Sequence, residues 1–513
     1  MGNHTENTKR IAKNTLMLYV RMLFSMLVSL YTSRVVLNTL GVEDYGIYNV
    51  VGGFVAMFSL VSSSLSASVS RFLTFELGQG DMERLKETFS TSLMIHLVLA
   101  GIVFILAESV GVWFLNTQMT IPSERLYAAN WVFQASILPF MFALFSVPYN
   151  ASITSHERMS AFAYIGILDV VLRLLIVLFI AYAPFQFDRL IVYSLLLVCV
   201  GMSLQCIYLW YCRKNFEECR FRLHFNKERW KEMGTFAGWN FLGNGAYLLN
   251  TQGVNILMNL FFGVGANAAR GIAAQVDAAV QAFVGNFTTA LNPQITKSYA
   301  AKDLDYMHML ICRGAKYSYF LMFFFALPLI LETPQVLSIW LDVVPPHAVL
   351  FVRLTLLSSL TVVIANSLVT AQSATGKIRK YQITITICGF WVFPLSFVAF
   401  KLGYPPEMAY IIYFIIYFGL IFVRIYLVKD LINLSWKKYF REVLLRVGLV
   451  SVCSCVITCL FYFNMQPSFT RLLIICMVSA VSTIGFMYLL GLERRERVFI
   501  ANKMQNKIHV FKF

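Results

Sequence analysis

Long apolar runs alternate with short polar connections along the whole chain. Runs of about 18 or more apolar residues are typical of membrane-spanning helices. Fourteen such runs are present, at roughly 14–37, 45–70, 89–114, 126–149, 160–183, 188–212, 234–262, 268–295, 313–332, 349–372, 380–400, 407–428, 442–463 and 470–491. The pattern predicts an all-α integral membrane protein with 14 transmembrane helices.

The distribution of Lys and Arg predicts the orientation of these helices. With the N-terminus in the cytoplasm, 31 of the 42 basic residues fall on inside segments and 5 on outside loops. Basic residues gather on the cytoplasmic side of membrane proteins. We therefore predict that both termini are cytoplasmic. The net charge of +16 fits this topology and anionic membrane lipids, so nucleic acid is not expected as a partner.

The residues that usually carry catalysis or bind metals form no recognisable motif. The ten cysteines are scattered, without the spacing of a zinc site or a disulfide framework. The sequence contains no nucleotide-binding loop and no nucleophile–base arrangement. We therefore expect no enzyme activity, no cofactor and no metal. The first apolar run is too long for a cleaved signal peptide and contains Arg21.

A weak internal sequence repeat predicts two related halves. A shift of 222 residues places Gly263-Val264 on Gly41-Val42, Thr296 on Thr74, and Asp303 on Asp81, without a gap. Internal repeats of this kind set the architecture of a chain. We predict an N-terminal six-helix bundle at 1–215, a C-terminal six-helix bundle at 216–432, and two further helices with a basic cytoplasmic tail at 433–513.

Polar residues form stripes on three of the predicted membrane helices. At 100° per residue, each set of side chains falls on one side of its helix. The sets are Asn14, Arg21, Ser25 and Thr32; Asn240, Asn244, Thr251 and Asn255; and Arg270, Asp277, Gln281, Thr288 and Asn292. Such stripes are too polar for lipid, so we predict that they face a water-filled central cleft between the halves.

Other charged residues within the predicted spans allow more than one interpretation. Asp169 and Arg173 are four residues apart and can form an ion pair. Arg34 is either an anchor near the outer surface or part of a site. Asp169, Asp277 and Glu108 are candidates for coupling to protons or sodium ions, because acids inside a membrane are rare and often functional. An acid already paired with Arg would carry ions poorly.

The segment from Arg34 to Tyr48 carries a recognisable motif, Leu40-Gly41-x-x-x-Tyr45-Gly46-x-Tyr48, within a predicted outside hairpin. This motif resembles the opening signature of Wzx-type O-antigen and polysaccharide flippases. These flippases form the polysaccharide transporter family of the multidrug/oligosaccharidyl-lipid/polysaccharide (MOP) exporter superfamily. Two six-helix halves, two further helices and basic inside loops extend the resemblance over essentially the whole chain.

The resemblance implies a flippase or exporter that works by alternating access. Its substrate would be an undecaprenyl-diphosphate-linked oligosaccharide repeat unit for O-antigen, lipopolysaccharide, capsule or exopolysaccharide biosynthesis. Glycan polymerase or assembly proteins would be further partners. In this sequence Arg21 and Arg270, with Arg34 and Arg173, are candidate ligands for a diphosphate. Asn240, Asn244, Asn255 and Gln281 are suited to sugar hydroxyls.

Three alternatives remain open at this point. A multidrug antiporter of the related MATE type would need unpaired acids in the cavity, whereas here the predicted stripes carry Arg beside each Asp. A membrane glycan polymerase or ligase usually has a large charged outside loop, and every predicted outside loop here is short. A non-transporting scaffold would leave the polar stripes unexplained.

Overall fold

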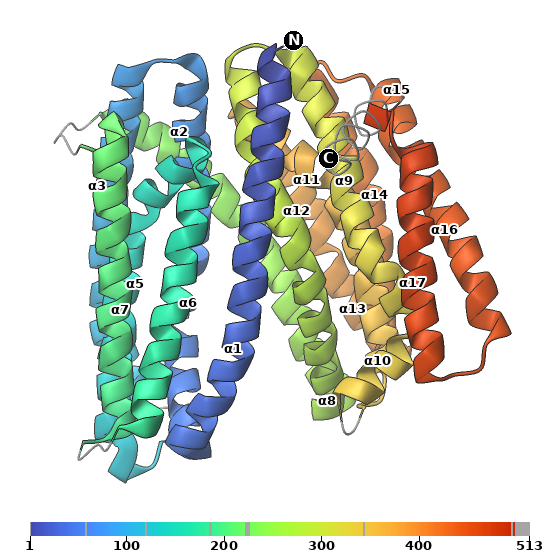
Figure 1. Cartoon of the computed structure of the whole chain (residues 1–513). Helices are drawn as coiled ribbons and strands as arrows, with labels where there is room; N and C mark the ends of the chain where they lie inside the picture. Colours follow the sequence, from blue (N-terminus) through green and yellow to red (C-terminus); the bar gives the residue numbers. More distant parts are fainter. Residues whose placement is uncertain are drawn as a thin grey trace, which may run out of the picture. The chain divides into compact units, whose positions relative to one another are not determined.

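The computed structural model describes residues 2–56, 59–117, 121–183, 187–220, 226–341, 344–493 and 496–497. Within these ranges the regular secondary structure is entirely helical (Figure 1). The α-helices are α1 (Gly2–Ala56), α2 (Ser59–Gln79), α3 (Met82–Leu106), α4 (Val112–Thr117), α5 (Leu126–Ser155), α6 (Met159–Tyr182), α7 (Arg189–Asn215), α8 (Lys227–Ala300), α9 (Leu304–Leu331), α10 (Thr333–Trp340), α11 (Ala348–Thr375), α12 (Arg379–Phe390), α13 (Val392–Lys401), α14 (Met408–Ile432), α15 (Trp436–Tyr439), α16 (Leu445–Asn464) and α17 (Phe469–Phe486).

Eleven helical segments within the described ranges are long and apolar enough to cross a membrane. The all-α membrane class is therefore confirmed, whereas the predicted count of 14 spans is not. The three predicted spans outside this set are 45–70, 234–262 and 268–295. Two of them belong to α8, where Asn, Gly, Arg and Asp interrupt the apolar pattern, and the third covers the Ser-rich start of α2 and residues 57–58, which lie outside the description.

The chain forms two compact units, and α8 contributes to both. Unit 1 comprises Met1–Asn244 and Thr296–Asp303, and unit 2 comprises Gly245–Ile295 and Leu304–Phe513. The predicted division into two repeated six-helix bundles and a C-terminal pair stays a prediction. The central cleft expected between the halves also stays a prediction.

In unit 1, helices α1, α5, α6 and α7 pack around an apolar core. Val36 of α1 is buried against Ile176 and Ile180 of α6. Two residues of the sequence motif, Leu40 and Tyr48, pack against this core, and the ring of Tyr48 lies 5.3 Å from that of Tyr193 in an edge-on arrangement. Helix α1 runs without a break through residues 40–46, where the sequence predicted a hairpin. Most side chains of these residues are outside the described part of the structure.

The two ends of unit 1 are each joined by ion pairs. At one end, Arg125 pairs with Asp44, also from a predicted outside loop, and with Asp188, the first residue of the predicted span 188–212. At the other end, Glu157 pairs with Arg10 and Lys297, all from predicted inside segments. Contacts between loops predicted on one side are what the predicted alternation requires. The assignment of either end to the cytoplasm stays a prediction.

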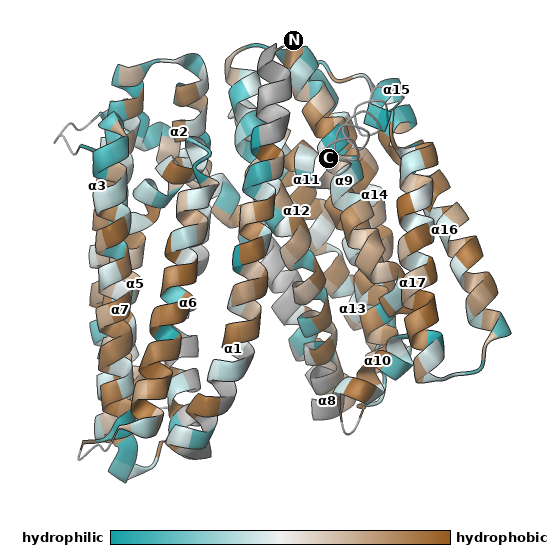
Figure 2. Ribbon diagram, in the orientation of Figure 1, coloured by the Kyte–Doolittle hydropathy of each residue, from teal (hydrophilic) through white to brown (hydrophobic). Residues whose placement is uncertain are grey.

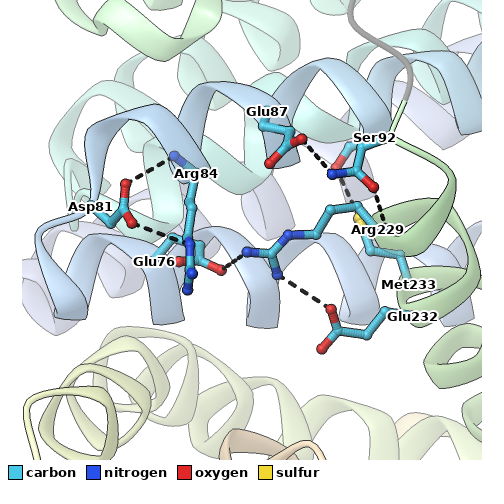
Figure 3. A network of polar contacts seen from close by, with 9 residues as sticks. Glu76, Asp81, Arg84, Glu87, Ser92, Arg229, Glu232 and Met233 are labelled. Atoms are coloured by element: carbon cyan, nitrogen blue, oxygen red, sulfur yellow. Dashed lines mark hydrogen bonds and ion pairs between the residues drawn. The ribbon is translucent and has the colours of Figure 1, made fainter.

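A polar network fixes the start of α8 onto α2 and α3 (Figure 3). The side chain of Asn226 caps α8 by accepting from the backbone N–H of Glu228, and its amide donates to Glu87 at 2.6 Å. Arg229 pairs with the buried Glu76 at 2.9 Å. Burial raises the pKa of Glu76, and Arg229 opposes this shift. These contacts anchor the start of α8 to the body of unit 1.

In unit 2, α9, α11 and α14 pack closely, and α16 and α17 pack on each other beside α9. Figure 2 shows hydrophobic residues along most of α16 and α17, as expected for the predicted C-terminal pair. Ion pairs join residues at or beyond the two ends of α17 to α9 and to the residue that follows it. Arg471 pairs with Glu332 at 2.8 Å, and the fully buried Lys316 lies 3.7 Å from both Glu493 and Glu496.

Candidate functional site

Unit 2 contains a cavity of about 730 Å³ lined by α8, α11, α13 and α14. This volume lies within the range of roughly 300–1,000 Å³ that is typical of small-molecule sites. Among the described residues, the lining combines one guanidinium, one carboxylate, several amides and hydroxyls, and two tyrosines with apolar side chains. The cavity therefore has both polar and apolar walls.

Two helices place their polar side chains on this cavity by simple helical spacing. On α8, Arg270, Asp277 and Gln281 follow one another at intervals of seven and four residues. On α11, Ser359 and Asn366 are seven residues apart, and Thr355 is four residues before Ser359. Such spacings place side chains on one face of a helix, so each helix presents a polar stripe to the same space.

Arg270 and Asp277 have different surroundings within the cavity. The guanidinium of Arg270 lies 5.8 Å from the centre of the Tyr410 ring, within the range of a cation–π contact. Ser359 Oγ donates to Asp277 Oδ1 at 2.6 Å. Within the described ranges Asp277 forms no ion pair. Arg270 and Asp277 thus line one cavity, as their shared stripe predicts, without an ion pair between them within these ranges.

Four of the predicted site residues share the cavity: Asn255, Arg270, Asp277 and Gln281. Sequence reasoning missed the contributions of α11 and α14. The signal was present in the spacing of Ser358, Ser359 and Asn366 within an otherwise apolar span, and in the pair Tyr410 and Tyr413.

The other described candidates belong to unit 1. Arg21 packs on α6, with its guanidinium 4.6 Å from the centre of the Phe162 ring. Gly166 makes room for this side chain, since a Cβ there would lie 2.6 Å from Arg21 Cδ. Arg173 donates to Asp169 at 2.6 Å, so the predicted ion pair is present.

Polar neighbours hold two more of these residues. Glu108 accepts from the amide of Gln134 at 3.1 Å, and Asn244 donates to Ser64 at 3.1 Å. Asn240 is half-buried on α8. The side chain of Arg34 lies outside the described part of the chain. The roles predicted for all these residues in binding or ion coupling stay predictions.

Comparison with known proteins identifies the family. The model of the polysaccharide biosynthesis protein family matches residues 11–299. The uncharacterized membrane protein EpsK of Bacillus subtilis (strain 168) is 20% identical over 286 residues, which are 55% of this chain and 56% of EpsK. The match thus spans about half the length of that curated relative.

Solved transporters share the fold of this chain. A MOP superfamily transporter from Pyrococcus furiosus, described as having a binding pocket of reversed polarity that suggests a different function, gives a TM-score of 0.72 at 13% identity. The alignment covers 83% of this chain and 96% of that one. A multidrug resistance MATE family transporter in an outward-facing conformation gives a TM-score of 0.70 at 13% identity, with the same two coverages.

The MATE transporter ClbM in complex with Rb⁺ gives a TM-score of 0.66 at 15% identity, covering 84% of this chain and 96% of ClbM. At these identities the likeness establishes the fold alone. The chain belongs to the polysaccharide biosynthesis protein family and has the fold of the MOP superfamily transporters.

Proposed function

We propose that this protein flips undecaprenyl-diphosphate-linked oligosaccharide repeat units from the inner to the outer leaflet of a bacterial inner membrane by alternating access. It would act as a transporter without enzyme activity, in O-antigen, capsule or exopolysaccharide biosynthesis. The family and the fold support a transporter for polysaccharide biosynthesis. The choice of a lipid-linked glycan rests on the chemistry of the cavity in unit 2.

The observation that carries this proposal is that the guanidinium of Arg270 lines the cavity together with the carboxylate of Asp277 and several amide and hydroxyl side chains. Arg270 can donate charge-assisted hydrogen bonds to a phosphate oxygen. Asn255, Gln281 and Asn366 can donate to and accept from sugar hydroxyls. A tyrosine pairs an apolar ring face with a polar hydroxyl, and a sugar ring likewise has both kinds of surface.

The test compares Arg270→Ala, Arg270→Lys and Lys401→Ala in a host that lacks the protein. Lys401 is an exposed residue of unit 2 outside the cavity, so its loss controls for the removal of one positive charge. A hydrogen bond to a charged group contributes about 1.5–3 kcal/mol. We therefore expect Arg270→Ala to lower glycan export about ten- to a hundredfold, with Arg270→Lys between it and the wild type.

A normal export rate in the Arg270→Ala variant, at wild-type abundance in the membrane, would contradict this site. Partial rescue by Lys would show that charge matters, and full loss in both variants would show that the planar guanidinium matters. The Lys401→Ala strain should export glycan at the wild-type rate.

A cation-coupled multidrug antiporter of the MATE type is the second candidate. It is favoured by the carboxylate of Asp277, which lines the cavity and forms no ion pair within the described ranges. New sensitivity to cationic drugs after gene deletion, with lipid-linked glycan unchanged, would favour the antiporter. A trapped lipid-linked repeat unit with unchanged drug sensitivity would favour the flippase.

A further inference from the structure

Unit 1 contains a second cavity, of about 460 Å³, that plays no part in the proposed export site. It lies where the beginning of α1, the turn between α5 and α6, and the C-terminal end of α8 meet. All three segments were predicted from the sequence to lie at the cytoplasmic surface. Its walls are mostly charged, which is unusual for a hollow between packed helices.

Glu157 is a buried residue in the lining of this cavity. Its backbone is left-handed, with φ at 59°, and the amide of Asn14 donates to its carbonyl oxygen at 3.0 Å. The buried carboxylate pairs with Arg10 at 2.8 Å and with Lys297 at 2.7 Å. Burial lowers the pKa of Lys297, and Glu157 opposes that shift. The carboxylate of Glu157 is thus already paired with two cations.

Two further cations line the same cavity without such a partner. Lys13 and Arg158 are exposed, and neither forms an ion pair within the described part of the chain. His156 is held elsewhere, because its ring lies 2.6 Å from Glu218 and stacks on Phe216. Among the described residues, the lining therefore carries four Lys and Arg side chains against one carboxylate. This excess creates a positive potential inside a concave wall.

We propose that this cavity binds a phosphoryl group at the membrane surface. Lys and Arg donors around one hollow are suited to the several oxygens of a phosphate or diphosphate. Ser160, which also lines the cavity, adds a neutral donor. The group would belong either to an anionic phospholipid headgroup, as expected for basic residues beside an inner leaflet, or to a soluble phosphate compound.

The pairing of Glu157 makes the site selective for anions over cations. A metal ion would have to displace both Arg10 and Lys297 from the buried carboxylate. A phosphoryl group would instead meet Lys13 and Arg158 with their charges uncompensated by any acid within the described ranges. This inference does not rest on the proposed export function, so either can fail without the other.

The test uses the purified full-length protein and two probes. Inorganic pyrophosphate is titrated calorimetrically, and thermal stability is compared in nanodiscs of phosphatidylglycerol and of phosphatidylcholine. The test variant is Lys13→Gln/Arg158→Gln, and the control is Lys231→Gln/Lys437→Gln, which removes two exposed charges outside the cavity. Lys13→Arg/Arg158→Lys keeps the charges and shows whether the altered segment still folds.

We expect Lys13→Gln/Arg158→Gln to weaken pyrophosphate binding about tenfold or more, or to abolish the extra stability in phosphatidylglycerol. The first result identifies a soluble phosphate compound and the second a lipid headgroup. The control pair should stay within about twofold of the wild type, because exposed charges act weakly. An equal loss in the control, or no response of the wild type to either probe, overturns the site.

Discussion

The buried ion pair between Arg471 and Glu332 should determine how firmly α17 is held to the rest of unit 2. Arg471 Nε lies 2.8 Å from Glu332 Oε1, and Nη2 donates to Oε2 at 2.9 Å. The side chains are 8% and 0% exposed. The guanidinium also lies 4.5 Å from the centre of the Tyr462 ring. We predict that Arg471→Leu strongly destabilises the protein.

The expected size follows from burial. Removing one partner of a buried pair leaves the other charge without compensation and costs about 3–5 kcal/mol. Replacing both partners by apolar residues removes that penalty and is often neutral. Arg471→Leu and Glu332→Leu should therefore each lower the midpoint of thermal denaturation by several degrees, and the double variant should recover most of that loss.

Arg446 provides the matched control. Its Nη1 lies 3.8 Å from Glu493, and both side chains are about a quarter to a third exposed, at 26% and 32%. A pair of this kind contributes about 0–1 kcal/mol. Thermal denaturation in detergent, followed by fluorescence-detected gel filtration, measures all four variants. An effect of Arg471→Leu no larger than that of Arg446→Leu, or a double variant as unstable as the singles, would refute the reasoning.

Two other positions give sharp predictions. A Cβ on Gly78 would lie 2.8 Å from Ala300 Cβ and 2.9 Å from Lys297 Cα, so Gly78→Ala should cost about 1–3 kcal/mol in thermal denaturation, as expected for overpacking. Gly101→Ala meets no atom within 4 Å and should be neutral or slightly stabilising, so equal effects of the two would contradict the close approach. At Asp277, replacement by Asn keeps the shape but removes the charge, and transport by inverted vesicles should lose its dependence on an applied proton or sodium gradient. Retained coupling in Asp277→Asn would exclude this carboxylate as the ion site.

The family and the polar face of α8 could be predicted from the sequence. Hydropathy and the motif around Leu40 and Tyr48 pointed to the correct family, and both residues pack against the core of unit 1. The spacing of Arg270, Asp277 and Gln281 correctly placed them on one face. These features are local, so they can be read from residue order without knowing which helices become neighbours.

The α11 wall of the cavity could not be predicted in the same way. Hydroxyl side chains in membrane helices often bond to their own backbone, as Ser358 does with the carbonyl oxygen of Leu354 at 2.8 Å. The sequence does not show which serine bonds to its own helix and which, like Ser359, donates to a distant side chain. The partner of Ser359, Asp277, is 82 residues away in sequence. The ion pairs of Arg471 with Glu332 and of Lys316 with Glu493 were missed for the same reason, since each joins residues far apart in the chain.

The most direct test of the proposed function is the location of lipid-linked glycan after the gene is deleted. We predict that completed single repeat units on undecaprenyl diphosphate accumulate on the cytoplasmic leaflet, inaccessible to a periplasmic probe. The wild-type gene should clear them, and Arg270→Ala should not. Single repeat units exposed on the outer leaflet of the deletion strain would instead mean that flipping occurs without this protein and that a later step is missing.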